Sequence, residues 1–409
     1  MLQSSREWLN TAINRSSMNR QSSILSRQWT GPQPPDEAAF RKGLAAECLR
    51  SLRTQTGATS PTDSGLLQQV VGAGGTAAGY LYGGWTTSVG LRAILRLVNH
   101  ELGEFGAILD WGCGSARTIR WFSDLPATTA LHGVDINPAA IAWCREHCRI
   151  GTFQHTAPLP PLPFATGSFD LVYGISVLTH LDETFQDAWL DELRRLVAPG
   201  GLVMLSIHGE GIARQALPGP HLQKFDTHGF LFEQATGPTV ELLPAFYQVA
   251  YHSRGYVEQR WCRGFRLLLF VNHGPLYRQS LVVMQRDDTP APVARPEPID
   301  LPMASLDFPE VSHSCAPGSA LEARGWCFGP QQRKVDLRLV LDGDVVGTCA
   351  AIEPRPDVGQ AFAAYPHAAR SGFSSRLSTD TWRPGLRVFW IESDASPIPL
   401  AATYLRVDG

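Results

Sequence analysis

The sequence has no excess of charge of one sign that would mark a nucleic-acid-binding surface. Its 35 Lys and Arg stand against 38 Asp and Glu, which leaves a formal net charge of −3. A protein without a basic excess has no general attraction for phosphate, so we expect no nucleic-acid partner. Only 18% of the residues are charged and 44% are hydrophobic, so most of the chain can bury a core.

Long apolar runs and closely paired cysteines are also absent. The longest apolar stretches, such as LLLFV at 267–271, are far shorter than the roughly 20 residues that cross a bilayer. The first residues, MLQSSREWLNTAINRSS, contain no apolar segment of signal-peptide length. The eight cysteines are dispersed and form no C-x-x-C pair, which favours a reducing compartment. We expect a cytoplasmic protein without a membrane span.

Composition divides the chain into four segments. Residues 1–35 are rich in Ser, Arg, Asn and Gln and are expected to form a disordered polar arm. Residues 36–286 begin with a helical pattern over 36–53 and are expected to form the main domain. Residues 287–304, DDTPAPVARPEPIDLPMA, are typical of a Pro-rich linker. Residues 305–409 show a different periodicity and form the last segment.

Apolar strands alternate with helices in the main domain, and this alternation predicts an α/β fold with a parallel, doubly wound sheet covered on both faces. Two later apolar runs, joined by a short loop with Gly274 and Pro275, predict an antiparallel pair at one sheet edge. The expected strands are 107–112, 131–136, 151–156, 169–176, 202–208, 265–272 and 280–286, and the expected helices are 115–124, 138–149 and 183–201.

The stretch ILDWGCGSAR at 108–117 places an acid and two glycines where a buried strand ends. Ligands of doubly wound sheets bind beyond the carboxyl ends of the strands, where the strand order reverses. The glycine spacing does not fit the G-x-G-x-x-G of a dinucleotide site, which disfavours a nicotinamide dehydrogenase. It fits acid-x-G-x-G-x-G as Asp110, Gly112, Gly114 and Ala116, in which the alanine is the smallest departure from glycine.

Five stretches in order over about 70–286 make this region resemble a class I S-adenosylmethionine-dependent methyltransferase, with a Rossmann-like fold. More narrowly, it is similar to bacterial methyltransferases found with polysaccharide glycosyltransferases. The stretches are ILDWGCGSAR, LHGVDINPAAIAWCREH, LPFATGSFDLVYGISVLTHL, LRRLVAPGGLVMLSIHG and YHSRGYVEQRW. The resemblance implies S-adenosyl-L-methionine as cofactor.

The resemblance also implies a set of cofactor-binding residues. Asp110, Gly112 and Gly114 would meet the methionine end, where an acid can accept from an ammonium group, and Arg117 would help to hold its carboxylate. The remaining positions lie on the second and fourth strands: Asp135 would accept from the ribose hydroxyls, Ile136 would pack on the adenine, and Ser176 would follow the fourth strand.

One feature departs from the family pattern. Many such enzymes carry an acid after the third strand that accepts from the adenine amino group. Here the stretch reads FQHTAPLPPLPF, without Asp or Glu. Backbone carbonyls, Thr156 or Gln154 are the alternatives for adenine recognition.

The candidate bases are histidines. Methyl transfer to a hydroxyl needs the partners to be positioned and a proton to be removed, and His is the usual base near neutral pH. His180 and His208 follow the fourth and fifth strands, and His252 precedes the last helix, which Ser253 is expected to cap. A structural role is the alternative for each of the three.

A metal site is not expected. Cys144, His147 and Cys148 lie close in sequence, and the two cysteines share a helix face. No second cluster supplies the remaining ligands of a tetrahedral site.

Residues 305–409 contain short strands around the hairpin signal Asp342-Gly343, which predicts a small all-β sandwich. This segment resembles the accessory module of many bacterial glycosyltransferases and related methyltransferases through Gly325-Trp326, the Arg355-to-Val358 stretch and Gly372-Phe373. We expect these residues to lie in the core and in turns. The alternative is that Trp326 and Phe373 stack on sugar rings.

The function expected from the whole chain is methylation of a sugar hydroxyl of a glycan or glycoconjugate, within enzyme class EC 2.1.1. Glycosyltransferases are expected as partners, in bacterial polysaccharide biosynthesis. A lipid, a small metabolite or a protein is the alternative acceptor. A non-catalytic interaction protein that retains the fold is the alternative of another class, for which Ala116 and the missing adenine acid would be signs of decay.

Overall fold

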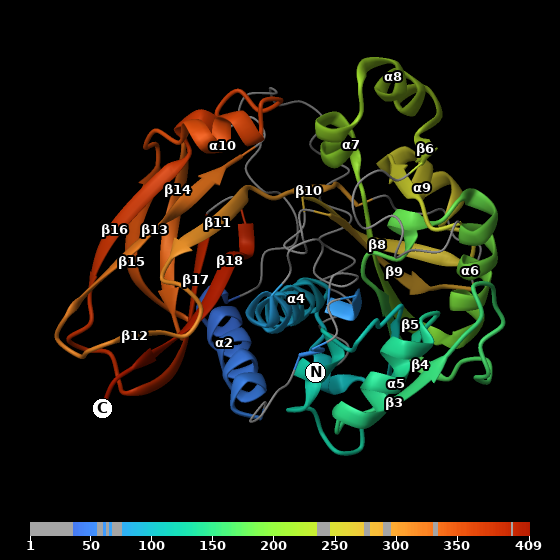
Figure 1. Ribbon diagram of the computed structural model, residues 1–409, viewed down its shortest axis with the longest axis horizontal. Coiled ribbons are helices and arrows are strands. Elements are labelled where there is room, and N and C mark those ends of the chain that lie inside the picture. Colours follow the sequence, from blue (N-terminus) through green and yellow to red (C-terminus); the bar gives the residue numbers. More distant parts are fainter. Residues whose placement is uncertain are drawn as a thin grey trace.

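The computed structural model describes residues 36–54, 60–62, 65–67, 76–234, 246–273, 279–288, 296–329, 334–393 and 396–409, and all structural statements below concern these residues. The arm predicted for 1–35 and the Gly274-Pro275 loop lie outside them. Figure 1 shows a large sheet and a β-rich region, with helices α2 (Glu37–Thr54) and α4 (Ala77–Leu97) between the two.

The larger sheet has the strand order β10-β8-β9-β5-β4-β1-β2-β3. The strands from β1 to β5 run parallel. β9 runs antiparallel to both β5 and β8, so the predicted antiparallel pair is confirmed. The strands are β1 (Ala107–Trp111), β2 (Ala130–Asp135), β3 (Thr152–His155), β4 (Phe169–Gly174), β5 (Val197–Ile207), β8 (Phe265–Asn272), β9 (Ser280–Arg286) and β10 (Ile299–Asp300).

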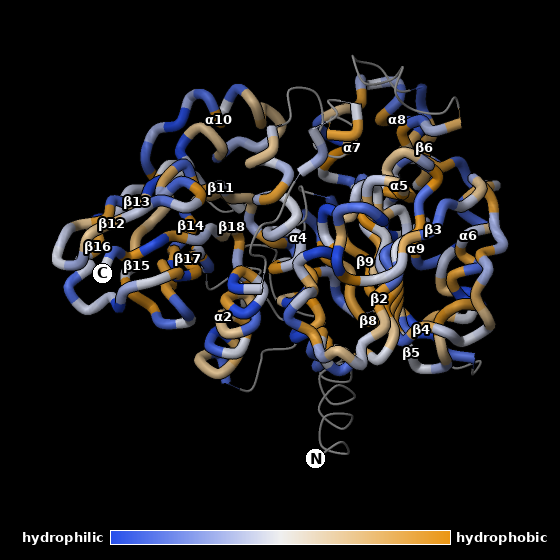
Figure 2. Tube along the Cα trace, turned by 60° about the horizontal axis from the view of Figure 1, so that its bottom comes forward, coloured by the Kyte–Doolittle hydropathy of each residue, from blue (hydrophilic) through white to orange (hydrophobic). Residues whose placement is uncertain are grey.

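Both faces of this sheet are buried, which explains why its strands are apolar at successive positions. In β1, Ile108 packs in one core with residues of α2, α4 and α5, and Leu109 packs in a second core with α6 and α9. The strands are largely hydrophobic in Figure 2. The α/β fold with a parallel-rich sheet is thereby confirmed. The helices named here for the first time are α5 (Pro138–His147), α6 (Glu183–Leu196) and α9 (Arg254–Arg260).

The prediction of an α-helix directly after β1 is wrong. Residues 115–124 form turns and a short 3-10 helix, η2 (Ile119–Phe122), whose four residues are all buried. Their apolar side chains are buried against neighbouring elements and do not form one face of an α-helix. The helix predicted for 183–201 ends at Leu196, because β5 begins at Val197 and includes the Pro-Gly-Gly that was expected to stop it.

A small group of elements lies between β5 and β8 in the chain. The strands β6 (Phe230–Glu233) and β7 (Val249–His252) pair antiparallel. A bridge between His208 and Tyr251 connects β7 to the end of β5. Ser253 caps α9 as predicted, since its side chain accepts from the Tyr256 N–H. Two further helices are α7 (Glu210–Ala216) and α8 (Gly219–His228).

The predicted linker is partly built into the larger sheet. Ile299–Asp300 form β10, which pairs parallel with β8, and Ile299 is buried. The next strand, β11, starts at Met303. The described part of 287–304 is therefore a packed connection, because its apolar residues contribute to the core.

The C-terminal region is β-rich. A three-stranded sheet, β11-β13-β16, and a five-stranded sheet, β12-β18-β17-β14-β15, enclose a common core. The predicted hairpin at Asp342-Gly343 joins β14 to β15, with both turn residues at positive φ. The elements are β11 (Met303–Phe308), β12 (His313–Cys315), β13 (Ala320–Phe328), β14 (Val335–Leu341), β15 (Asp344–Ala351), α10 (Pro356–Ala361), β16 (Gly372–Ser378), β17 (Gly385–Ser393) and β18 (Ser396–Val407).

The β-rich region and the larger sheet share one hydrophobic core. Trp85 of α4 packs edge to face against Tyr404 of β18, with ring centroids 5.2 Å apart. The Tyr82 hydroxyl donates to the Ala402 carbonyl at 2.7 Å. Val340 and Trp390 of the β-rich region belong to the same cluster as the buried residues of α2 and α4. No described helix is long and apolar enough to cross a membrane.

Candidate functional site

The site lies where the strand order reverses, at the carboxyl ends of β1 and β4. These strands are neighbours, but the chain leaves β1 toward β2 on the other side. The segment after β1, residues 112–118, is called the cofactor loop below. It turns through the left-handed region at three alternate residues, Gly112 (φ 76°), Gly114 (φ 52°) and Ala116 (φ 59°). The N–H groups of Gly112 and Cys113 both donate to the Val134 carbonyl of β2, at 2.9 and 3.0 Å. These bonds hold the turns of the loop beside the crevice at the strand ends.

Ala116 takes the backbone conformation of the third glycine in the motif. It is fully buried, and its N–H donates to the Cys113 carbonyl at 2.9 Å in a tight turn. The left-handed region costs a non-glycine residue about 1–2 kcal/mol. The alanine therefore preserves the shape of the loop at a cost in strain, which the sequence pattern did not reveal.

Asp110 is buried at the end of β1, 4% exposed. Burial raises its pKa from 3.8 to about 7, and the charge of Asp135 adds to this rise. The neighbouring Tyr173 hydroxyl and the Arg117 charge act in the opposite direction. With a pKa of about 7, this carboxyl group is only partly ionised at pH 7. A cation that binds beside it would favour the charged form.

Asp135 ends β2 and holds the cofactor loop in place. One carboxylate oxygen accepts from the Gly114 N–H at 2.7 Å, and the other accepts from the Asn137 N–H at 2.8 Å. Burial raises the pKa of this carboxyl group, and these backbone hydrogen bonds lower it. Each oxygen keeps a further lone pair, so the same carboxylate can still accept from a ligand hydroxyl.

The predicted adenine side lies next to Asp135. Ile136 is half-buried. Thr156 is buried after β3, and its N–H donates to the Asp135 carbonyl at 3.0 Å. Its hydroxyl donates to the neighbouring Ala157 carbonyl at 3.3 Å. Gln154 lies within β3, in register with Val134. Of the two side-chain alternatives, Thr156 is therefore the one placed beside Asp135 and Ile136.

Ser176, after β4, belongs to a hydrogen-bonded group that joins three strand ends. It has φ 61°, and its N–H donates to the Ser206 hydroxyl of β5 at 2.7 Å. The Gln279 amide, just before β9, donates to the Ser176 hydroxyl at 2.8 Å and accepts from the Ser206 hydroxyl at 2.6 Å. Sequence analysis missed Gln279, because no local pattern connects it to a residue about a hundred positions earlier.

His180 lies at the end of η3 (Leu178–His180), against a tyrosine that sequence analysis also missed. Its ring stacks on Tyr247 with centroids 4.1 Å apart. Its Nδ1 lies 2.7 Å from the Gln248 carbonyl, which accepts only, so Nδ1 carries the proton and Nε2 has the lone pair. Burial lowers the pKa of His180 to about 4. The ring is therefore neutral at pH 7 and able to accept a proton.

His208, after β5, faces His180 edge to face with centroids 6.1 Å apart. Burial lowers its pKa to about 4, and the nearby His180 contributes to this. Its Nδ1 is buried without a hydrogen-bond partner among the described residues. The structure thus brings two of the three predicted histidines together at adjacent strand ends.

His252 lies beside His208, whose carbonyl accepts from the His252 N–H at 2.9 Å, but its ring is enclosed in the core, which corrects its assignment as a candidate base. Its ring is fully buried, and Nε2 lies within hydrogen-bond distance of the Gln186 side-chain amide of α6. Trp261 and Tyr256 pack around the ring, and burial lowers its pKa to about 3. A ring enclosed in this way has no route to an acceptor, so the structural role applies.

The cysteines considered for a metal site serve the fold instead. The thiols of Cys113 and Cys144 both lie near the Gly114 carbonyl, at 3.6 and 3.4 Å. Cys148 lies beside Cys144, and the two thiols influence each other's pKa. His147 points elsewhere and stacks on Trp143. Within the described part of the chain, no group of three or more His, Cys, Asp or Glu could hold a metal ion.

A comparison with known families bears on this site. Residues 108–201 match the family model described as a methyltransferase domain. The matched segment contains the cofactor loop, Asp135 and His180. For residues 108–201, this match confirms the similarity to a methyltransferase domain that the sequence predicts. S-adenosyl-L-methionine, the cofactor expected from the sequence, is the methyl donor that this match supports.

The chain also has curated relatives and similar solved structures. It is 35% identical over 111 residues to methyltransferase str3 of Strobilurus tenacellus, which covers 27% of this chain and 38% of that protein. It is 29% identical over 109 residues to the uncharacterized protein syc1184_c of Synechococcus sp., which covers 25% of each chain. The chain thus matches well under half the length of either relative.

A solved S-adenosylmethionine-dependent methyltransferase from Mesorhizobium loti is 18% identical. The superposition covers 47% of this chain and 96% of that chain, with a TM-score of 0.35. The PH0226 protein from Pyrococcus horikoshii is 17% identical, and the superposition covers 48% of this chain and 89% of that chain, with a TM-score of 0.34. The methyltransferase assignment rests on the family match and not on these superpositions.

Proposed function

We propose that this chain is an S-adenosylmethionine-dependent O-methyltransferase. The observation that carries the proposal is the arrangement at the strand reversal. There Asp110, the left-handed cofactor loop and Asp135 lie at the ends of β1 and β2, and His180 follows the adjacent β4. Acids at these two strand ends suit a ligand with an ammonium group and a ribose, and the loop has no dinucleotide spacing.

The residues present fit the cofactor at each of its parts. Asp110 would accept from the ammonium group, and the half-buried Arg117 would pair with the carboxylate. Asp135 would accept from the ribose hydroxyls with its remaining lone pairs, and Ile136 would pack on the adenine. When bound, S-adenosylmethionine supplies a methyl group that its sulfonium already activates.

His180 is the proposed base. The hydrogen bond from Nδ1 to the Gln248 carbonyl fixes the tautomer, so Nε2 can take the acceptor's hydroxyl proton as the oxygen takes the methyl. His208 is the second candidate, since its unpartnered Nδ1 also lies at a strand end. A low pKa keeps both rings neutral before the reaction and makes them weak bases. Orientation of the partners then supplies much of the rate.

We propose a sugar hydroxyl of a glycan or glycoconjugate as the acceptor. The support is the resemblance to methyltransferases that accompany polysaccharide glycosyltransferases, which would be partners in the cytoplasm. Ser176 and Tyr247 are uncharged and half-buried near His180, and such groups suit a neutral hydroxyl. A lipid, a small metabolite or a protein acceptor is an alternative outcome of the test below.

The first test measures the binding of S-adenosylhomocysteine by calorimetry, with NAD as the control ligand and Asp135→Ala as the variant. We expect binding in the micromolar range that the substitution weakens, and no binding of NAD. A folded protein that binds no S-adenosylhomocysteine would contradict the enzyme proposal and favour the interaction protein.

The second test supplies labelled S-adenosylmethionine and panels of glycans, lipids, small hydroxyl compounds and proteins. We expect label in the glycan panel alone. His180→Gln is expected to lower the rate by about 10² to 10⁴ and to leave the binding of S-adenosylhomocysteine unchanged. Loss of binding in His180→Gln would instead indicate a structural role for this residue.

A further inference from the structure

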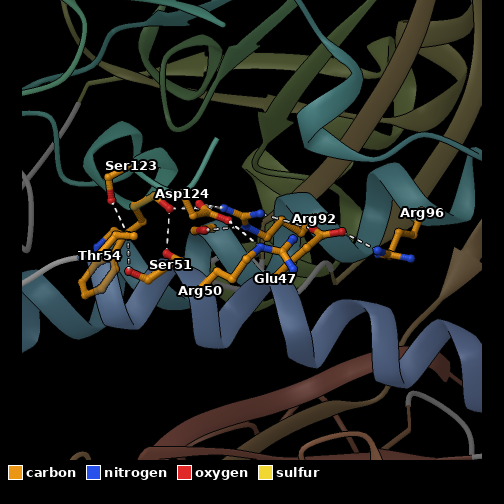
Figure 3. Close-up of polar contacts among 10 residues, drawn as sticks. Glu47, Arg50, Ser51, Thr54, Arg92, Arg96, Ser123 and Asp124 are labelled. Atoms are coloured by element: carbon orange, nitrogen blue, oxygen red, sulfur yellow. Dashed lines mark hydrogen bonds and ion pairs between the residues drawn. The ribbon is translucent and has the colours of Figure 1, made fainter. Parts of the chain in front are cut away.

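Helix α2 presents a polar face to the segment that follows the cofactor loop. Glu47, Ser51 and Thr54 lie on one side of α2, spaced by four and three residues (Figure 3). Ser51 and Thr54 contact residues 121–123, and Glu47 contacts the arginines of α4. The Ser51 hydroxyl donates to the Trp121 carbonyl at 2.7 Å. The Thr54 and Ser123 hydroxyls lie 2.7 Å apart.

A buried ionic network strengthens this contact. Arg92 of α4 is 1% exposed, and its guanidinium joins Glu47 at 3.2 Å and Asp124 at 2.6 Å. The same guanidinium donates to the Trp121 carbonyl at 3.2 Å. Arg96 also donates to Glu47. Buried charges are costly unless they are paired, so removing one partner leaves a strong penalty on the others.

We expect this network to anchor the chain after the cofactor loop, a role that a longer helix has in a typical doubly wound sheet. There, an α-helix follows the glycine loop and anchors it through its backbone hydrogen bonds. Here only the four residues of η2 follow the loop. The contacts from Ser51, Arg92 and Asp124 therefore fix the chain just beyond the loop.

The second half of the loop itself is held by α4. The Tyr80 hydroxyl donates to the Ser115 carbonyl. A Cβ on Gly84 would lie 2.0 Å from the Arg117 carbonyl oxygen, so α4 approaches the loop backbone too closely for any side chain. Residues 115–124 are thus held between α4 and α2 from both ends.

We infer that α2 positions the cofactor loop, and that Glu47, Ser51 and Arg92 set cofactor affinity without touching the cofactor. They are positioning residues in this sense. The inference rests on the proposed function, because it concerns the same cofactor site. It adds the N-terminal helix, which lies outside the segment that matches the methyltransferase family, to the requirements for binding.

The β-rich region supports α2 from the opposite side. Arg41 of α2 pairs at 3.0 Å with Glu392 of β17, whose side chain is 2% exposed. Arg338 and the Trp390 indole N–H also bind Glu392, at 2.9 and 3.1 Å. α2 therefore has fixed contacts on both sides, and its position relative to the loop is defined by the whole fold.

The test compares the binding of S-adenosylhomocysteine by the full chain and by two variants, together with thermal unfolding of each. Ser51→Ala removes a single hydrogen bond and is expected to weaken binding about fivefold. Glu47→Gln breaks the ionic network and is expected to weaken binding about tenfold or more. If Glu47→Gln fails to fold, Ser51→Ala decides the result.

The matched control is Ser371→Ala in the β-rich region. Ser371 is also 1% exposed, and its hydroxyl donates to the Ala368 carbonyl at 2.7 Å. We expect a similar loss of melting temperature in Ser371→Ala and Ser51→Ala, with weaker binding in Ser51→Ala alone. Equal affinities of the wild-type chain, Ser51→Ala and Ser371→Ala, or equal weakening in both serine variants, would overturn the positioning role. A wild-type chain that binds no ligand would overturn the proposed function as well.

Discussion

Three left-handed residues shape the cofactor loop, and only two of them are glycines. Gly112 has no room for a side chain, because an added Cβ would lie 2.4 Å from the Val177 Cγ2. Ala116 shows that the loop tolerates a methyl group at the third position despite φ 59°. The glycines of this motif are thus required to different degrees, which the spacing alone does not indicate.

We predict that Gly112→Ala lowers the free energy of unfolding by about 2 kcal/mol, because it combines left-handed strain with a steric clash. Ala116→Gly is the control. At this position, relief of backbone strain offsets the loss of a buried methyl group and the greater backbone entropy of glycine in the unfolded chain. We therefore expect the free energy of unfolding to change by less than about 1 kcal/mol. Chemical denaturation of both variants measures this. A larger loss in Ala116→Gly than in Gly112→Ala would show that the backbone conformation at these positions is misassigned.

If Asp110 binds the ammonium group as proposed, its raised pKa gives cofactor binding a defined pH dependence. Its pKa is raised to about 7 in the ligand-free chain, so the carboxyl group is protonated below that value. An ammonium group binds to the charged form, and binding therefore releases a proton. We predict that the affinity for S-adenosylhomocysteine falls about tenfold for each pH unit below 7. Calorimetry in buffers of different ionisation enthalpy measures the released proton.

The control for this dependence is Asp110→Asn, which keeps the shape of the side chain and cannot titrate. We expect it to bind more weakly at pH 8 and to show a flat pH profile between pH 5 and 7. A profile that falls equally in Asp110→Asn would assign the proton to another group.

At the scale of elements, three histidines that lie in or after β4, β5 and β7 are buried in their neutral form. The pKa values of His180 and His208 are lowered to about 4, and that of His252 to about 3. The unfolded chain binds these protons near pH 6.5. Between the unfolded and folded values the unfolded state holds more protons, so stability is complete above about pH 6.5 and is lost as the pH falls toward 4.

We predict that His252→Gln reduces this slope by about 1.4 kcal/mol per pH unit between pH 4.5 and 6. The variant loses stability at pH 7 as well, because the ring fills a closed space beside Gln186. The quantity to compare is therefore the pH dependence of the free energy of unfolding, and not its value at pH 7. Denaturation curves at several pH values measure it, and an unchanged slope would show that His252 is not neutral in the fold.

The sequence predicted the elements whose pattern is local. β1 and β5 contain the short apolar runs AIL and LVML, and Asp110, Gly112 and Asp135 lie at the ends of β1 and β2. Segment 115–124 was misassigned, because its apolar residues are buried by contacts with distant helices and not by one helical face. Local spacing cannot distinguish these two causes.

The missed residues of the site depend on tertiary contacts. Gln279 reaches Ser176 because β9 inserts beside β5. Tyr247 reaches His180 from the segment before β7. Neither belongs to a motif, and both become visible only when the strand order is known. The proposed cofactor side could thus be predicted from one loop and two strand ends, whereas the residues grouped around Ser176 and His180 could not.

At the scale of the whole molecule, the described residues of the β-rich region pack directly against those of the larger sheet and its helices. Its residues Val388 and Trp390 share a hydrophobic cluster with Leu44 of α2 and Trp85 of α4. β10 joins the connecting segment to the larger sheet. A region joined through a common core unfolds together with its neighbour, whereas an independent accessory domain unfolds separately.

We therefore predict a single cooperative transition for the full chain in scanning calorimetry. Trp390→Ala tests the cause, because it removes a large side chain that is 1% exposed and packs between the two parts, at a cost of about 3–5 kcal/mol. If the shared core couples the two parts, Trp390→Ala lowers the whole transition or splits it into two. Phe373→Ala, which removes an equally buried ring in the β-rich core alone, should lower the transition without splitting it. Two transitions in the unmodified chain would show instead that the contacts with α2 and α4 are too weak to join the domains.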